Sequence, residues 1–247
     1  MKTRNLADAA YSLLKEQILN GALAPNSTIS EPMMSSEFAL SKAPVRTALL
    51  RLQHEELIRS VPRQGYVVSR LSARDAIDLL EFRSLLETDV AFHAAGRIDR
   101  KFAQHFEDEF AKGYTYDDAD SVLAFIQLNR EHRTRLAEIA GNARTAKAVQ
   151  DVNFLLSRYT RLSITTFDWT KISAERVRRL NAALLSGAPE RAREIAAEHL
   201  YISAAAMLYA LNILGEDIHA AVKESGRPIA QLALAEMKSF NMTRWAG

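Results

Sequence analysis

The apolar residues of this chain change their spacing twice, and this change is the strongest constraint on the fold. Residues 6–20 repeat at steps of three and four, which is the period of an amphipathic helix. Two short β-prone runs, residues 57–61 and 65–69, then flank a turn at residues 62–64. From residue 72 onward the helical period returns. The sequence therefore predicts a mainly α-helical protein with one small β-hairpin between two domains.

The length of 247 residues is enough for two domains with separate cores. We expect a first domain at residues 1–70 and a second at residues 71–247, with a core at about 72–213 and a C-terminal extension at 214–247. After a first helix from about Ser72 to Ala95, the second domain is predicted to form helices at about 99–112, 118–140, 143–166, 174–186, 189–213 and 228–239.

Two serines are expected to cap helices of the second domain. Ser72 precedes its first helix, and Asp75 three residues later resembles a capping box. Ser173 is the expected cap of the helix that begins near residue 174. These caps set the predicted helix starts.

The composition excludes several kinds of site. The chain has no cysteine, so disulfides, thiol nucleophiles and thiolate metal ligands are absent, which fits a reducing cytoplasm. The N-terminus does not resemble a signal peptide. The most apolar stretch, Ile202 to Leu214, is too short to span a bilayer. We therefore expect a soluble, cytoplasmic protein without a membrane partner.

The first domain is predicted to contain three helices before the hairpin. Gly21 ends the first helix, and either Ser30 or Ser35 caps a short second helix that runs to about Leu40. Ser41 precedes the third helix, which has Pro44 in its first turn, where a missing backbone donor has no consequence. This third helix should bury one apolar face, formed by Val45, Ala48, Leu49 and Leu52.

Helix, helix, turn, helix and hairpin, in this order, form a winged helix-turn-helix, whose third helix lies in the major groove of DNA. Residues 1–70 carry nine Lys or Arg against six Asp or Glu, a net charge of +3, so the remainder of the chain is close to −1. A basic first domain joined to a near-neutral second one fits a DNA-binding head on a sensing body.

The third helix and the hairpin resemble the head of the GntR family of regulators. The stretches Leu40-Ser41-Lys42-Ala43-Pro44-Val45-Arg46-Thr47-Ala48-Leu49-Leu50-Arg51-Leu52 and Pro62-Arg63-Gln64-Gly65 match the family pattern Ser-Arg-x-Pro-Val-Arg-x-Ala-Leu-x-x-Leu followed by a Pro-x-x-Gly wing. The resemblance covers most of residues 6–70.

This resemblance implies which residues touch DNA. At the start of the third helix, backbone donors and side chains would face the groove, where arginine can bind guanine through two hydrogen bonds. The implied contacts in the helix are Ser41, Lys42 and Arg46, with Thr47 and Arg51 behind them. In the wing they are Arg63, Gln64 and Gly65, which would reach the minor groove or the backbone. The alternative is that these are solvated surface charges.

The chain also departs from the family pattern at three places. Asn26 follows Pro25 where glycine is usual, Lys42 replaces arginine, and residues 38–40 read Phe-Ala-Leu in place of Leu-Gly-Val. The operator is therefore expected to differ from typical family sites.

The second domain resembles the FCD effector domain of FadR-type members of that family, a dimerising bundle of six or seven helices. Residues 79–87 match an Arg-x-x-Leu-Glu signature, and Asn129 to Asn142 matches a stretch that ends in Ala-Gly-Asn. A weaker match runs from Arg176 to His199.

Many relatives bind a divalent metal with one Asp and three His, and the resemblance places these ligands on Asn129, Arg133, Val177 and His199. An amide, a cation, an alkyl group and one imidazole are not the ligand set of a divalent ion. We therefore predict no cofactor. A slip of one residue would place His132 where Arg133 stands, and this leaves a divalent metal as the alternative.

Without a metal, another positive group must attract the effector. Arg133 would supply a forked cation at the metal position, and Arg83 points into the same cavity in relatives. We predict a small anion, such as a carboxylate, bound by Arg83 and Arg133 with Asn129 and His199 as hydrogen-bonding partners. The alternative is that Arg133 faces solvent.

Together these features predict a ligand-responsive repressor that binds a palindromic double-stranded DNA operator as a homodimer. One alternative is a constitutive DNA-binding dimer with a degenerate sensor. The other is a metal-dependent enzyme, against which stands the absence of a glycine-rich phosphate loop, of Gly-x-Ser-x-Gly and of His-Glu-x-x-His.

Overall fold

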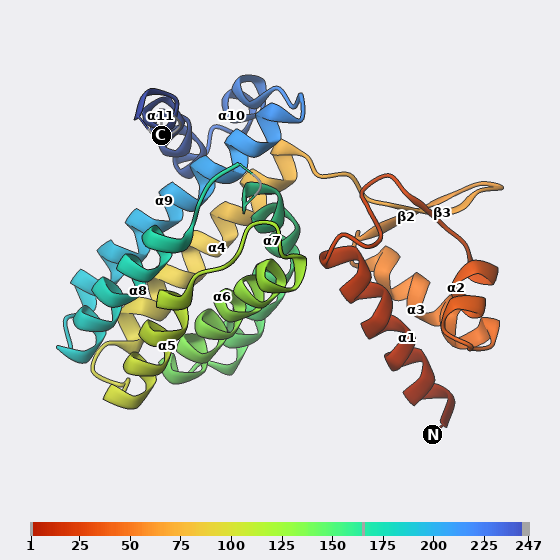
Figure 1. The fold of residues 1–247 in the computed structure, drawn as a ribbon, viewed down its shortest axis with the longest axis horizontal. Coiled ribbons are helices and arrows are strands. Elements are labelled where there is room, and N and C mark those ends of the chain that lie inside the picture. The colour runs from red at the N-terminus through yellow and green to blue at the C-terminus, as the bar shows by residue number, and fades with distance from the viewer. Residues whose placement is uncertain (1, 165, 244–247) are drawn as a thin grey trace. The chain divides into compact units, whose positions relative to one another are not determined.

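The computed structural model describes residues 2–164 and 166–243, and side chains for residues 6–164 and 166–237. It divides into two compact units, Met1–Leu71 and Ser72–Gly247, here called the head and the body. Both are mainly helical, and β-strands occur in the head, so the predicted fold class is confirmed (Figure 1).

The head contains three helices and three short strands. They are α1 (Lys2–Leu19), β1 (Thr28–Ile29), α2 (Glu31–Glu37), α3 (Lys42–His54), β2 (Ile58–Val61) and β3 (Gly65–Val68). Of the two predicted caps of α2, Ser30 is the one used, because its hydroxyl accepts a hydrogen bond of 3.3 Å from the Met33 N–H. Ser41 precedes α3 as predicted, although its side chain makes no capping hydrogen bond.

The hairpin belongs to a three-stranded antiparallel sheet in the order β1-β3-β2. Strands β2 and β3 were predicted, whereas β1 was not, because two residues are too few to show a period. Ile29 of β1 pairs with Tyr66 of β3. Gly65 has a φ of +93°, and a Cβ at this position would lie 2.7 Å from the Ile29 carbonyl oxygen. The sheet itself therefore requires glycine at residue 65.

The head core joins the three helices to the sheet. The predicted apolar face of α3 is buried, with Val45, Leu49 and Leu52 fully covered. They share the core with apolar residues of the other elements, among them Leu14, Ile18, Ile29, Leu57 and Val68. This packing fixes the opposite face of α3 toward solvent.

The body is a bundle of helices with a C-terminal pair. The bundle consists of α4 (Ala73–Ala94), α5 (Arg100–Lys112), α6 (Ala119–Ala140), α7 (Ala143–Ile164), α8 (Thr170–Leu185) and α9 (Pro189–Ile213). The extension adds α10 (Ile218–Ser225), which was not predicted, and α11 (Pro228–Thr243). Helix α4 packs against α6, α7 and α9, and the extension lies at one end of the bundle (Figure 1).

Of the two predicted caps of the body, one is wrong and the other is formed by half of its capping box. Ser173 is not a cap, because α8 begins at Thr170 and Ser173 lies buried within it. Ser72 does cap α4, accepting from the Asp75 N–H, but the second half of the capping box is not formed. Asp75 accepts a hydrogen bond from the Tyr159 hydroxyl instead. A residue of α7 therefore helps to fix the start of α4.

Helix α11 is attached to the bundle by packing and by charge. It contacts α9 and α4, and Arg227, just before it, forms an ion pair of 2.9 Å with Glu81 of α4. In the part of the chain that the structure describes, no helix is both long and apolar enough to cross a bilayer.

Candidate functional site

The outward face of α3 is the first candidate site. Ser41, Lys42 and Arg46 are all exposed at the start of this helix, on the side opposite the core. The helix N-terminus adds free backbone donors at the same end. Side chains and backbone together form a surface that can accept phosphates and base edges.

Arg46 is held in place by an acidic residue that was not singled out in the sequence. Its Nε and Nη2 atoms donate hydrogen bonds of 2.9 Å each to the two carboxylate oxygens of Glu31, at the start of α2. This hydrogen bond from Arg46 lowers the pKa of Glu31, so the pair stays charged. The Arg46 side chain remains 63% exposed and can still reach a ligand.

Two other predicted residues of α3 are engaged within the head. The Thr47 hydroxyl donates to the Ala43 carbonyl at 3.1 Å. Arg51 forms an ion pair with Asp8 of α1 at 3.3 Å and stacks on the Tyr11 ring at 3.6 Å from its centre. Arg51 thus helps to hold α1 against α3. The structure also places Leu50, an exposed apolar residue, on the outward face of α3.

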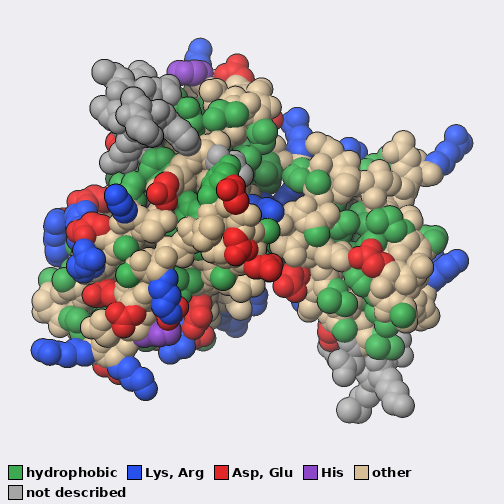
Figure 2. Space-filling view, viewed as in Figure 1, with side chains coloured by type: hydrophobic (Ala, Val, Ile, Leu, Met, Phe, Trp, Pro, Cys, Tyr) green, Lys and Arg blue, Asp and Glu red, His purple; other side chains and the backbone are tan. Residues whose placement is uncertain are grey.

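The wing residues stand at the tip of the hairpin. Arg63 and Gln64 are exposed, and the Gln64 N–H closes the turn on the Val61 carbonyl at 3.1 Å. Figure 2 shows a basic side chain projecting from this tip, whereas on the visible face of the body acidic and basic side chains alternate. Gly65 is only partly exposed and serves the sheet, as described above.

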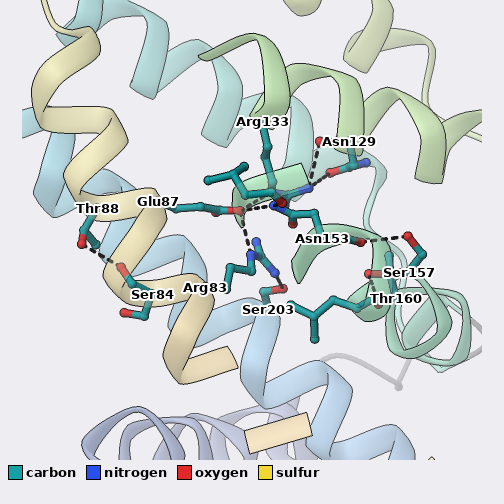
Figure 3. A network of polar contacts seen from close by, with 12 residues as sticks. Arg83, Ser84, Glu87, Thr88, Asn129, Arg133, Asn153, Ser157, Thr160 and Ser203 are labelled. Atoms are coloured by element: carbon teal, nitrogen blue, oxygen red, sulfur yellow. Dashed lines mark hydrogen bonds and ion pairs between the residues drawn. The ribbon is translucent and has the colours of Figure 1, made fainter. Parts of the chain in front are cut away.

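The second candidate site lies inside the body, around Glu87 of α4 (Figure 3). One oxygen, Glu87 Oε1, accepts hydrogen bonds from Arg83 Nε at 2.9 Å and from Asn153 Nδ2 at 3.0 Å. Arg133 Nε of α6 lies 3.1 Å from the same oxygen, although its N–H is not aligned for a hydrogen bond. One carboxylate therefore serves two arginines.

The neighbouring charges determine the pKa values of Glu87 and Arg133. Burial raises the pKa of Glu87, but Arg83 and Arg133 outweigh burial and lower it to about 2. Burial, and then repulsion from Arg83, lowers the pKa of Arg133 to about 10. Glu87 and Arg133 are therefore both charged near neutral pH. Sequence reasoning missed Glu87, although it is the Glu of the Arg-x-x-Leu-Glu signature.

The four predicted effector residues are brought together in two layers. Arg133 and His199 line a small cavity, with about 30 Å³ of free space, between α4, α6, α8 and α9. Arg83 and Asn129 lie behind them: Arg83 contacts Glu87 and Ser203, and the Asn129 oxygens accept from Arg133. Because the Arg133 side chain is only 12% exposed, the alternative that it faces solvent is wrong.

The cavity has two further polar residues that were not predicted to bind the effector. Arg176 of α8 is 8% exposed, and His132 of α6 is 1% exposed. The His132 ring lies 4.8 Å from the centre of the Phe106 ring and 5.7 Å from that of Phe110. Burial, and then Arg176, lowers the pKa of His132 and of His199 well below the usual value. Both imidazoles are therefore neutral.

The arrangement does not fit a divalent metal ion. Of the implied ligand positions, Val177 is a buried alkyl group and Arg133 is paired with Glu87. His132, the residue that a one-residue slip would supply, packs among phenylalanine rings. Among the described residues, no group of three or more His, Cys, Asp or Glu is placed to hold a metal. A cationic guanidinium at the ligand position would repel the ion.

Comparison with known proteins assigns both units. The family pattern described as "FCD domain" matches residues 78–201, and the one described as "Bacterial regulatory proteins, gntR family" matches residues 6–68. The uncharacterized HTH-type transcriptional regulator YdhC of Bacillus subtilis (strain 168) is 23% identical over 193 residues, which are 77% of this chain and 84% of that protein.

A second relative is the gluconate operon transcriptional repressor of the same species. It is 30% identical over 172 residues, which are 66% of this chain and 69% of that protein. Among solved structures, Escherichia coli McbR/YncC has a TM-score of 0.69 at 20% identity, over 82% of this chain and 96% of that one. This last likeness concerns the fold.

Proposed function

The chain belongs to the GntR family of bacterial regulatory proteins and carries an FCD domain, and on this basis we propose that it is a ligand-responsive repressor that binds a palindromic operator as a homodimer. It is a transcriptional regulator and not an enzyme, since the matching families and relatives are DNA-binding regulators. We expect it to act in the cytoplasm.

The observation that carries the DNA-binding proposal is the outward face of α3. Lys42 and Arg46 are exposed there without being needed for the core, and Ser41 leaves its hydroxyl outside the helix cap. Phosphate contacts by such groups provide salt-dependent affinity, and arginine contacts to guanine provide specificity. The wing residues Arg63 and Gln64 would add contacts to the backbone or minor groove.

A palindromic operator follows if two heads bind together. Two copies of a helix-turn-helix read half-sites about one helical turn apart, so the symmetry of the dimer is repeated in the DNA. Sedimentation should then give twice the chain mass of 27.6 kDa. A monomer at the concentrations that bind operator would contradict the dimer.

The experiment for DNA binding begins with selection of bound sequences from random duplexes. We expect a palindromic consensus, and we expect the double variant Lys42→Ala, Arg46→Ala to lose sequence-selective binding by at least tenfold, since one bidentate base contact contributes about 1–3 kcal/mol of discrimination. The matched control is Lys147→Ala, Arg178→Ala, which removes two exposed, ion-paired cations of the body. Undiminished selective binding by the first double variant would overturn the proposal.

For the effector, we propose a small anion that binds at the cavity of the body, with Arg133 and His199 in its wall and Arg83 and Asn129 behind them. The support is an excess of buried positive charge around one carboxylate. Because one relative is named for the gluconate operon, gluconate belongs in the first panel of anions. Binding of an anion should raise the melting temperature and change operator affinity. An anion that stabilises the body without altering operator affinity would favour a constitutive dimer.

A further inference from the structure

Unpartnered polar atoms of the body gather at the cavity. Of the eleven buried side-chain nitrogen and oxygen atoms without a hydrogen-bond partner among the described residues, seven belong to Arg83, His132, Arg133, Arg176 and His199. Buried polar groups are hydrogen-bonded in the great majority of cases, so a cluster of exceptions needs a reason. A ligand that accepts these hydrogen bonds supplies that reason.

Arg176 is the arginine with the most unsatisfied hydrogen-bond donors at the cavity. Its Nε and Nη2 atoms have no acceptor, and its guanidinium carbon lies 5.9 Å from the centre of the Phe110 ring, which is a weak compensation. Unlike Arg83 and Arg133, it is not paired with Glu87. Because Glu87 is the one carboxylate in the described lining of the cavity, three arginines share a single negative charge.

The rest of the cavity wall has a different character. Helices α4, α6, α8 and α9 contribute a group of buried apolar side chains, which are Val90, Ala91, Leu136, Leu180 and Ala196. These side chains offer no hydrogen-bond partner to a ligand. A ligand with several hydroxyl groups would lose hydrogen bonds to water there without replacing them.

We propose that the cavity binds a small carboxylate with an apolar body, that Arg176 is its main anchor, and that no metal ion takes part. The carboxylate accepts the fork of donors on Arg176, with Arg133 and His199 beside it. The apolar body packs against the Val90 and Leu180 side of the cavity, which has to widen to admit it because the free space there is about 30 Å³. This inference rests on the proposed sensing function and names the class of its ligand.

The anchor is accessible from one side of the bundle. Arg176 and His199 line not only the inner cavity but also an outer groove of about 370 Å³ that involves α8, α9 and α11. The cations Lys171 and Arg179 in the same groove are balanced by its glutamates, so the unpaired Arg176 is the group that would hold an anion there. A carboxylate can therefore reach Arg176 from this groove, and Glu236 of α11 borders the path.

The effect of a substitution on the melting temperature distinguishes an unpaired buried arginine from one that holds the bundle together. Replacing it by an apolar side chain of similar length should stabilise the ligand-free protein, because the desolvation penalty is removed. Arg176→Met should therefore raise the melting temperature while weakening ligand binding. A residue that holds the bundle together would lower the melting temperature on the same change.

The test uses the full-length protein in thermal-shift and calorimetric titrations with hexanoate, benzoate, gluconate and sulfate. We expect hexanoate or benzoate to bind more tightly than gluconate and sulfate, with the same affinity in excess EDTA. Arg176→Met should weaken this binding by at least about 30-fold, the lower end for removing one partner of a buried charged contact. The matched control is Arg191→Met, an exposed position of α9 outside the cavity and the groove, where the side chain is paired with Glu194 at 2.8 Å. The affinity of this variant should be unchanged.

Several results would overturn the inference. They are tighter binding of gluconate or sulfate, binding that disappears in EDTA, no binding of either apolar acid, and full binding by Arg176→Met. Tight gluconate binding would leave the sensing function intact and refute only the ligand class. Selective operator binding, measured on the same preparation, tests the proposed function separately.

Discussion

The head and the body both use arginine at their candidate sites, but in opposite surroundings. In the head, the Arg46 side chain is 63% exposed and has a carboxylate of its own in Glu31. In the body, Arg176 is 8% exposed and its Nε and Nη2 atoms have no acceptor among the described residues, while Arg83 and Arg133 share Glu87. The head therefore has a paired arginine that is exposed to water, whereas the body has buried arginines with too few carboxylates to pair with them.

This difference determines how the arginines of each unit can bind a ligand. An exposed ion pair contributes about 0–1 kcal/mol, so Arg46 can leave Glu31 for a base or phosphate at little cost. A buried cation without a partner is destabilising, and its retention makes sense where a ligand completes it. The head is thus ready to bind by rearranging side chains, whereas the body is stabilised when an anion arrives.

The largest test of this contrast is Glu87→Gln. Removing the shared carboxylate leaves Arg83 and Arg133 without their counter-charge inside the bundle, which should destabilise the protein by about 3–5 kcal/mol in urea unfolding. The exposed Glu131→Gln, which breaks a surface pair with Arg135, should change stability by less than about 0.5 kcal/mol. Similar losses of unfolding free energy in both variants would show that burial does not determine how much these charges contribute to stability.

Acid should have a related effect on the body. The pKa of Glu87 is lowered to about 2, below its usual value near 4.3 in an unfolded chain. Its stabilising contribution is therefore complete above about pH 5 and is lost as the pH falls from there through 4.3 toward 2. The whole loss amounts to about 3 kcal/mol. Urea unfolding of wild type and Glu87→Gln between pH 5 and 2 measures it, and an equal slope in both proteins would contradict the assignment to Glu87.

In the head, Arg46→Ala should separate binding from stability. Loss of its base contacts should weaken selective DNA binding by about 1–3 kcal/mol in fluorescence anisotropy. The unfolding free energy should change by no more than about 1 kcal/mol, because an exposed pair contributes little. If Arg46→Ala instead destabilised the head strongly, Arg46 would be a structural residue like the buried arginines, and the contrast would fail.

The same contrast limits what the sequence could predict. Period and capping residues are local, and they predicted α3, its buried face and the hairpin at residues 57–69 correctly. The pairing of Arg46 with Glu31, fifteen residues away, depends on how α2 meets α3 and has no local pattern. The strand β1 and the helix α10 were missed because short elements have too few residues for a period.

The body cavity was predicted in part, for a similar reason. Comparison with a metal-binding pattern led to Arg133, which is indeed buried beside the cavity together with His199. Arg176 lines the cavity next to the implied ligand position Val177 but is not itself a ligand position, so the metal-binding pattern did not indicate it. A buried, unpartnered charge can be identified only when all neighbouring helices are in place.

The smallest expected effect concerns backbone strain in the head, in contrast to the unpaired buried charge in the body. Ala39 has a φ of +52°, in the turn between α2 and α3 where the family pattern has glycine. The left-handed conformation costs a residue with a Cβ roughly 1 kcal/mol, whereas glycine adopts it freely but loses more chain entropy on folding. Ala39→Gly should therefore stabilise the head by about 0.5–1 kcal/mol in urea unfolding.

The matched control, Ala43→Gly, lies in the first turn of α3 with helical geometry and should destabilise the head by a similar amount. Neither change touches the arginines of the body, so an altered affinity for the anionic ligand in Ala39→Gly would mean that head and body are energetically coupled even without DNA.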